Sequence, residues 1–198
     1  MWELNCEDGG NRRFIMVQLP EPTPEDSFAM NAGYRTISDI GKERIRGFIT
    51  KLGEGSLFQD SDDLGVRVFK LTESNYRLWN GIEEDALESY AEQMQLFADS
   101  PLIEGWVPEN VIYEVAVKEG YRLDILIEQV TGIEKSTIFR VVSADKQQSF
   151  LICLDEELFQ DELNKLELTN DDLFVCRDQT LDDTTAANLA LQCRLKTI

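Results

Sequence analysis

The sequence predicts a chain of the α/β and α+β classes, in which a βαβ unit is followed by a small α+β domain. Two apolar runs of strand length, at residues 14–19 and 66–71, flank an amphipathic helical pattern at residues 36–53. Strand, helix and strand in this order form a βαβ unit, which normally belongs to a larger parallel sheet. After residue 81, short strand patterns alternate with helical ones, as in a small domain with a mixed or antiparallel sheet. We therefore expect two domains, residues 1–80 and 81–198.

The first predicted strand is the run FIMVQL, Phe14 to Leu19, which is apolar throughout except for Gln18. Such a run is typical of a strand that is covered on both faces, as in a parallel sheet. The strand cannot continue, because prolines without a backbone N–H follow it at positions 20, 22 and 24.

The following stretch, TISDIGKERIRGFITKL, has apolar residues at helical spacing and predicts a crossover helix. Thr36 or Ser38 is its expected N-cap and Gly53 its expected end. The opposite face is basic and has the charge to contact DNA phosphates in a longer protein. A solvated helix face is the commoner explanation of such a pattern, and we favour it for these side chains, which are Arg35, Lys42, Arg44, Arg46 and Lys51. The run LGVRVFKL then predicts the second strand.

The second half of the chain carries the patterns of a complete α+β domain. Helices are predicted over the acidic stretch at residues 83–98 and over residues 108–120, 156–166 and 182–193. Strands are predicted over residues 127–132, 136–144, 149–154, 172–176 and 194–198. We expect the second and third of these strands to form an antiparallel hairpin, and Asp155 to cap the helix that begins at residue 156.

The chain has no histidine and four widely spaced cysteines, which excludes most zinc sites and most Ser/His or Cys/His chemistry. Because Cys153 and Cys176 sit inside apolar runs and no C-x-x-C pair is present, we expect buried free thiols. No apolar run approaches the length of a membrane span, and residues 1–4 lack the features of a secretory signal. We therefore expect a cytoplasmic protein with no membrane partner.

The net charge of −19 is unevenly distributed along the chain. Residues 1–80 hold 10 Lys/Arg and 13 Asp/Glu, whereas residues 81–198 hold 9 and 25, so the second part contributes −16 of the total. Such a surface repels phosphate and predicts a poor autonomous binder of DNA or membranes. The same acidity leaves open an alternative, a free-standing acidic interaction protein or DNA mimic that inhibits a nucleic-acid enzyme.

Two further groups of residues have a functional and a structural explanation. The acid pairs Asp62-Asp63, Asp171-Asp172 and Asp182-Asp183 resemble metal ligands, but they fall at turns and helix starts where Asp caps the backbone, and we favour capping. Trp79 and Trp106 flank the acidic helix, and Trp106, beside Pro108, has the character of an interface anchor, although burial in the core between the two halves is at least as good an explanation.

Several segments, in order along the chain, resemble one protein family. They are ELNCEDGGNRRFIMVQLPEPT, AGYRTISDIGKERIRGFI, LGVRVFKLTESNY, YEVAVKEGY and FLICLDEEL. They look like the C-terminal part of the Mod subunit of type III restriction-modification systems, a family of adenine-specific DNA methyltransferases that use S-adenosylmethionine. The resemblance implies that FIMVQL and VRVFKL are the second and third strands of a class I methyltransferase sheet, and that the chain begins within the helix that precedes them.

The resemblance also shows what the chain lacks. The family's catalytic D-P-P-Y motif and its glycine-rich F-x-G-x-G cofactor loop are absent from the sequence. The only expected trace of the cofactor site is the carboxyl end of the first strand, where Gln18, with Leu19 and Pro20 beside it, takes the place of a group that meets the cofactor ribose. We therefore expect no catalysis and no S-adenosylmethionine binding by this chain.

By the same resemblance, we expect the surviving role to be assembly with Mod and Res subunits, with DNA contacted only through the full-length protein. Because the two predicted strands would leave an unpaired sheet edge, we also expect a homo-oligomer that buries this edge.

Overall fold

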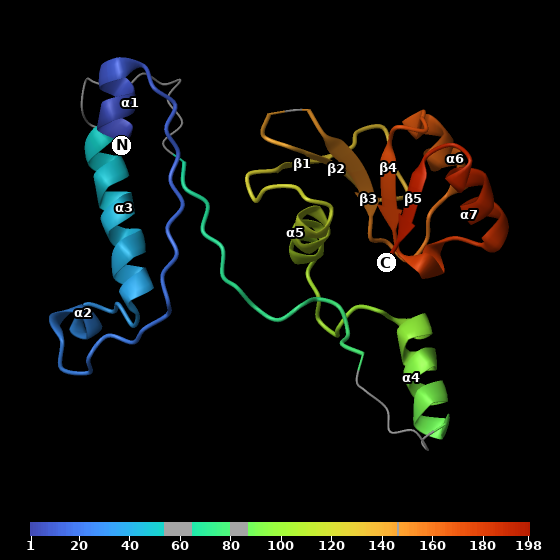
Figure 1. The fold of residues 1–198 in the computed structure, drawn as a ribbon, viewed down its shortest axis with the longest axis horizontal. Helices are drawn as coiled ribbons and strands as arrows, with labels where there is room; N and C mark the ends of the chain where they lie inside the picture. Colours follow the sequence, from blue (N-terminus) through green and yellow to red (C-terminus); the bar gives the residue numbers. More distant parts are fainter. Residues whose placement is uncertain (54–64, 80–86, 146) are drawn as a thin grey trace. The chain divides into compact units, whose positions relative to one another are not determined.

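A computed structural model describes residues 1–53, 65–79, 87–145 and 147–198. The chain divides into two compact units, Met1–Val68 and Phe69–Ile198 (Figure 1). Within the described residues, no helix is both long enough and apolar enough to cross a membrane.

The N-terminal unit is built around one long helix. Its helices are α1 (Trp2–Asp8), α2 (Phe28–Asn31) and α3 (Ile37–Gly53). The prediction of α3 is confirmed, including its end at Gly53. Its N-terminus is fixed by Thr36, whose hydroxyl accepts a hydrogen bond from the backbone N–H of Asp39 at 3.2 Å, while the Asp39 carboxylate accepts one from the N–H of Thr36 at 3.1 Å. Ser38 does not cap the helix, because its hydroxyl donates to the Leu19 carbonyl at 3.4 Å instead.

The two strands predicted for this part of the chain are not formed. Residues 14–19 and 66–71 run without strand pairing, so the predicted βαβ unit is wrong for the described residues. Their apolar side chains are open to solvent: Ile15 is 92% exposed, Val17 90% and Leu71 99%. The physical reason is that a strand is stabilised by pairing with a neighbouring strand and by cover for its faces, and among the described residues neither segment pairs with a strand.

The N-terminal unit consequently has almost no core. Among its side chains whose burial is described, only Thr23 and Leu52 are buried. The Trp2 ring packs edge-on against Phe14, with ring centroids 5.3 Å apart, and stacks on Phe48 at 5.8 Å. These contacts hold α1 against the extended segment and α3, but they leave most of the unit's apolar surface uncovered.

The C-terminal unit contains a five-stranded mixed sheet in the order β1-β2-β3-β4-β5, which confirms the predicted mixed α/β and α+β class. The strands are β1 (Leu126–Gln129), β2 (Ile138–Val142), β3 (Ser149–Cys153), β4 (Leu173–Cys176) and β5 (Arg194–Thr197). The β1–β2 and β2–β3 pairs are antiparallel, as predicted for the hairpin, whereas β3, β4 and β5 run parallel to one another.

Helices cover both faces of this sheet (Figure 1). The helices of the unit are α4 (Leu87–Asp99), α5 (Pro108–Lys118), α6 (Gln160–Leu163) and α7 (Asp183–Ala190), with the 3₁₀ turns η1 (Asn164–Leu166) and η2 (Asp178–Thr180). On one face α5 packs against Val141, Phe150, Ile152 and Val175. On the other face α6 and α7 pack against Ile138, Leu151, Phe174 and Cys176. This double cover explains why β3 and β4 are apolar at nearly every position.

Two carboxylates hold the loop between β1 and β2. Glu162 in α6 is buried, and its Oε1 accepts hydrogen bonds from the backbone N–H groups of Glu134 at 2.7 Å and Lys135 at 2.6 Å. Asp155 accepts one from the N–H of Thr137. The prediction that Asp155 caps a helix beginning at residue 156 is therefore wrong: α6 starts only at Gln160, because this carboxylate is engaged by the neighbouring loop. Asp182, by contrast, caps α7 as predicted, accepting from the N–H of Thr185 at 2.8 Å.

Candidate functional site

The residues predicted as the trace of a cofactor site lie together but form no cradle. Gln18, Leu19 and Pro20 are exposed, and the Gln18 amide donates to the adjacent Leu19 carbonyl at 3.2 Å. A ribose-binding group must be held at the carboxyl end of a strand within a sheet, and this segment is in no strand. Within the described residues, Gln18, Leu19 and Pro20 therefore do not form the site that S-adenosylmethionine would need.

The three cysteines whose side chains the structure describes are buried and are not activated as nucleophiles. Cys153, Cys176 and Cys193 are buried free thiols, as predicted for the first two. Burial raises the pKa of Cys153 to about 11 and that of Cys176 to about 12, so both thiols are protonated at neutral pH. Within the part of the chain that the structure describes, no group of three or more His, Cys, Asp or Glu side chains is placed to hold a metal ion.

In each of the two acid pairs that lie in the described residues, one carboxylate accepts hydrogen bonds from a nearby backbone N–H group. Asp172 accepts from the N–H of Thr169 at 2.8 Å and from its hydroxyl at 2.7 Å, and Asp182 caps α7. Asp62 and Asp63 lie outside the described residues. On the predicted basic face of α3, Lys42 and Arg46 pair with acids of the same helix, Asp39 at 2.8 Å and Glu43 at 3.3 Å.

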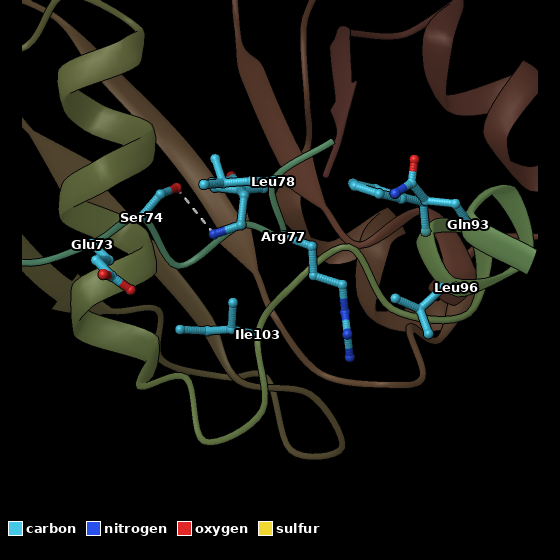
Figure 2. A pocket seen from close by; sticks show the side chains of 9 residues that line it. Glu73, Ser74, Arg77, Leu78, Gln93, Leu96 and Ile103 are labelled. Atoms are coloured by element: carbon cyan, nitrogen blue, oxygen red, sulfur yellow. Dashed lines mark hydrogen bonds between the residues drawn. The ribbon is translucent and has the colours of Figure 1, made fainter. Parts of the chain in front are cut away.

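A pocket of about 360 Å³ lies in the C-terminal unit, where the sequence did not indicate one. It is bounded by the segment at residues 73–78, by one face of α4 and by Ile103 (Figure 2). Its lining residues are Glu73, Ser74, Tyr76, Arg77, Leu78, Gln93, Leu96, Phe97 and Ile103. Apolar side chains from three separate segments thus converge on a space that is large enough for one or two side chains of a partner or for a small ligand.

The segment at residues 73–78 is held in place by Glu114 on α5. The Glu114 carboxylate accepts hydrogen bonds from the Ser74 hydroxyl at 2.5 Å, from the backbone N–H of Asn75 at 2.8 Å and from its side-chain amide at 2.9 Å. Lys118, one turn further along α5, pairs with the same carboxylate at 3.0 Å. These residues form the Glu114 network, which joins one wall of the pocket to the core helix.

Backbone pairing fixes the other side of the same segment. Tyr76 and Leu102 form an isolated antiparallel bridge, and the N–H of Arg77 donates to the Pro101 carbonyl at 2.8 Å. The Arg77 Nε donates to the carbonyls of Ser100 and Leu102 at 2.8 and 3.2 Å. Figure 2 shows the Arg77 side chain extending between Ile103 and Leu96. The guanidinium is thereby fixed as a structural part of the pocket wall.

Two ionisable groups, Tyr76 in the pocket wall and Glu114 behind it, are not poised for proton transfer. Partial burial would raise the pKa of Glu114, but the hydrogen bonds from Ser74, Asn75 and Lys118 outweigh it and lower the pKa to about 2. Burial, together with the Glu114 charge, raises the pKa of Tyr76 to about 12. At neutral pH the carboxylate is charged and the phenol is neutral, and both are far from the range of a general acid or base.

Two further side chains lie on or against α4. The Oε1 atom of Gln93, a lining residue, is buried and has no hydrogen-bond partner among the described residues. Trp79 does not line the pocket but packs on Tyr90 and on the lining residue Phe97 of α4, with ring centroids 5.7 and 5.4 Å apart, and stays 47% exposed. Trp106, which the sequence suggested as a possible anchor, is partly buried against the core on the α5 face of the sheet.

Comparisons with known proteins show which proteins part of this chain is similar to. No protein-family model matches the chain, and no solved structure matches it. The StyLTI Mod subunit of Salmonella typhimurium, a type III restriction-modification enzyme, is 36% identical over 67 residues, which cover 34% of this chain and 10% of that protein. The EcoP15I Mod subunit of Escherichia coli, also of type III, is 47% identical over 45 residues, which cover 23% of this chain and 7% of that protein.

Part of this chain is thus related to Mod subunits. The matched segments span a tenth or less of the length of these relatives, so the relationship concerns a region and not a whole Mod protein.

Proposed function

We propose that the chain corresponds to the C-terminal part of an adenine-specific DNA methyltransferase, the Mod subunit of a type III restriction-modification system, and that it serves subunit assembly. The partial similarity to two Mod subunits supports the relationship. Within this proposal residues 1–80 are the end of the catalytic domain, and residues 81–198 are a separate C-terminal domain. Nothing in the comparisons favours the alternative of a DNA mimic.

The chain is proposed to be catalytically silent. Methyl transfer to an adenine amine requires a grip on the flipped base and an adjacent methyl donor. The sequence contains neither D-P-P-Y nor F-x-G-x-G, and Gln18 with its neighbours offers no cradle for a donor. DNA is therefore contacted through a full-length assembly and not by this chain, whose net charge of −19 opposes binding to phosphates.

The observation that carries the assembly role is the uncovered apolar segment at residues 14–19. Four of its side chains, Ile15, Met16, Val17 and Leu19, are between 63% and 92% exposed in an extended backbone without sheet partners. Burying one such side chain contributes about 1.5–3 kcal/mol, so leaving all four in water forgoes several kcal/mol. A partner that pairs with this backbone and covers these side chains would recover that energy.

Co-purification of the tagged chain with the Mod and Res polypeptides of its own host tests the proposal. We expect the chain to co-elute with at least one of them, and Val17→Asp to abolish co-elution, because a carboxylate would have to be buried in the contact. Leu191→Asp is the matched control, since Leu191 is 79% exposed in the C-terminal unit. Failure of the unaltered chain to associate with either polypeptide, or equal association of Val17→Asp, would contradict the assembly role.

A further inference from the structure

A buried arginine lies at the carboxyl end of β4. Arg177 follows Cys176, the last residue of the strand, and only 7% of its surface is exposed. Arginine is rarely buried unless a carboxylate or another anion compensates its charge. The partners of this side chain therefore decide whether the site is complete.

The partners of Arg177 leave its charge largely uncompensated. Its Nη2 donates to the neutral Gln179 Oε1 at 3.2 Å. The Glu156 carboxylate is 3.8 Å from Nη1, beyond hydrogen-bond distance, and its side chain is 89% exposed. The Nε atom is buried and has no acceptor among the described residues. The planar guanidinium can donate two parallel hydrogen bonds to the two oxygens of a carboxylate or phosphate, and Arg177 has no such partner within hydrogen-bond distance among the described residues.

The side chain of Trp106, the residue before the N-cap of α5, lies beside this guanidinium. The ring of Trp106 is 5.9 Å from the Arg177 guanidinium carbon, and the residue after it, Val107, is the N-cap of α5. Val107 has no side chain that can cap the helix, so the first free N–H groups of α5 have no capping acceptor there. Glu109 in the first turn of α5 offsets part of the partial positive charge of this helix N-terminus.

The location is also the one where α/β sheets commonly bind ligands. Arg177 follows the middle one of three parallel strands, β3, β4 and β5, and the carboxyl ends of parallel strands form one edge of a sheet. The buried Nε of Arg177, which has no acceptor among the described residues, therefore calls for a negatively charged group at this edge.

We infer that Arg177 is the central residue of an oxyanion-binding site, which takes a carboxylate or phosphate group. Two oxygens of the anion accept hydrogen bonds from Nε and Nη2, which lie on the same side of the guanidinium, and the anion replaces Gln179 at Nη2. Because Nε is closed to solvent, side chains around it must move when the anion enters. Glu156 adds a negative charge beside the site and lowers the affinity for the anion. This inference does not depend on the proposed relationship to Mod.

Nuclear magnetic resonance on the full-length chain tests the site, with the Nε–H signal of Arg177 and the indole N–H signal of Trp106 as reporters. Sodium acetate and inorganic phosphate are titrated separately, against sodium chloride at the same ionic strength. We expect both signals to shift along a saturating curve with at least one of the two oxyanions and not with chloride. Saturation by one oxyanion only identifies the class of ligand, and saturation by neither overturns the inference.

Two substitutions and a control extend the test, with the affinity for the anion measured from the shift of the Trp106 indole N–H signal. Glu156→Gln removes a nearby negative charge from an exposed side chain and should tighten anion binding about two- to fivefold. Arg177→Lys keeps the charge but lacks the planar fork and should weaken binding about tenfold. Arg122→Met, which removes a guanidinium whose side chain is 75% exposed and paired with Asp124, should leave the affinity unchanged. Weaker binding in Glu156→Gln, or unchanged binding in Arg177→Lys, would contradict the site.

Discussion

Replacing Glu114 by glutamine removes the charge on which the pocket wall depends. The carboxylate accepts from Ser74 and Asn75 and pairs with Lys118, so Glu114→Gln leaves at least two of these donors without an acceptor. The lowering of the Glu114 pKa from 4.5 to about 2 corresponds to about 3 kcal/mol of stabilisation of the charged form. Lys118 is half exposed and solvent screens part of this interaction, so we expect a loss of about 1–2 kcal/mol in the free energy of unfolding at pH 7.

The pH dependence follows from the direction of the shift. Because the pKa of Glu114 is lower in the folded state than in the unfolded state, its contribution is complete above the unfolded value of about 4.5 and is lost as pH falls toward 2. The difference in stability between the unaltered chain and Glu114→Gln should therefore fall by more than half between pH 5 and pH 3. Other carboxylates titrate in the same range, but they do so in both proteins and cancel in the difference.

Urea unfolding of the C-terminal unit, followed by the fluorescence of its tryptophans, measures this difference. Glu128→Gln is the control, because Glu128 is exposed on β1 and its substitution should change the unfolding free energy by less than about 0.5 kcal/mol. A Glu114→Gln variant that is as stable as the control at pH 7, or a stability difference that does not change with pH, would refute the reasoning.

Three further predictions concern ligands, association and thiols. Calorimetry with S-adenosylmethionine should detect no binding, since Gln18 and its neighbours form no cradle; micromolar affinity would show that the site lies elsewhere. Light scattering should report an oligomer, with Val17→Asp shifting it toward the monomer, whereas a monodisperse monomer at high concentration would argue that the segment at residues 14–19 is covered in solution. Cys153 and Cys176 should react with a thiol reagent at pH 8 only on unfolding, because burial raises the pKa of both thiols; prompt labelling of the native chain would contradict their burial.

The C-terminal unit was well predicted because its local patterns agree with its tertiary contacts. The apolar runs that contain β3 and β4 are buried on both faces, and Asp182 is followed by a helix that it caps. In each case the pattern and the environment favour the same structure. Asp155 is an exception, because its carboxylate can either cap a helix or accept a hydrogen bond from a neighbouring loop. The backbone N–H of Thr137, which comes from the neighbouring loop, donates to it, and the helix cap is not formed.

The N-terminal unit was predicted less well, because an apolar run shows that a segment prefers to be covered but not that a cover exists. FIMVQL has the composition of a central strand, yet it meets no neighbouring strand within the described residues. The pocket was missed for a related reason. Ser74 and Glu114 are 40 positions apart, and only the folding of residues 73–78 onto α5 brings them together. An unpartnered atom such as the Nε of Arg177 likewise has no signature in the sequence.

Amide hydrogen exchange, on the chain alone and in its co-purified complex with Mod or Res, tests the central claim most directly. In the chain alone, residues 14–19 should exchange rapidly and residues 150–154 slowly, because only the latter are hydrogen-bonded within a covered sheet. In the complex, exchange at residues 14–19 should slow at least about tenfold as their backbone gains partners, whereas residues 150–154 should be unaffected. Exchange at residues 14–19 that is equally slow in the free chain, or unchanged in the complex, would contradict the account of an uncovered segment that is completed by assembly.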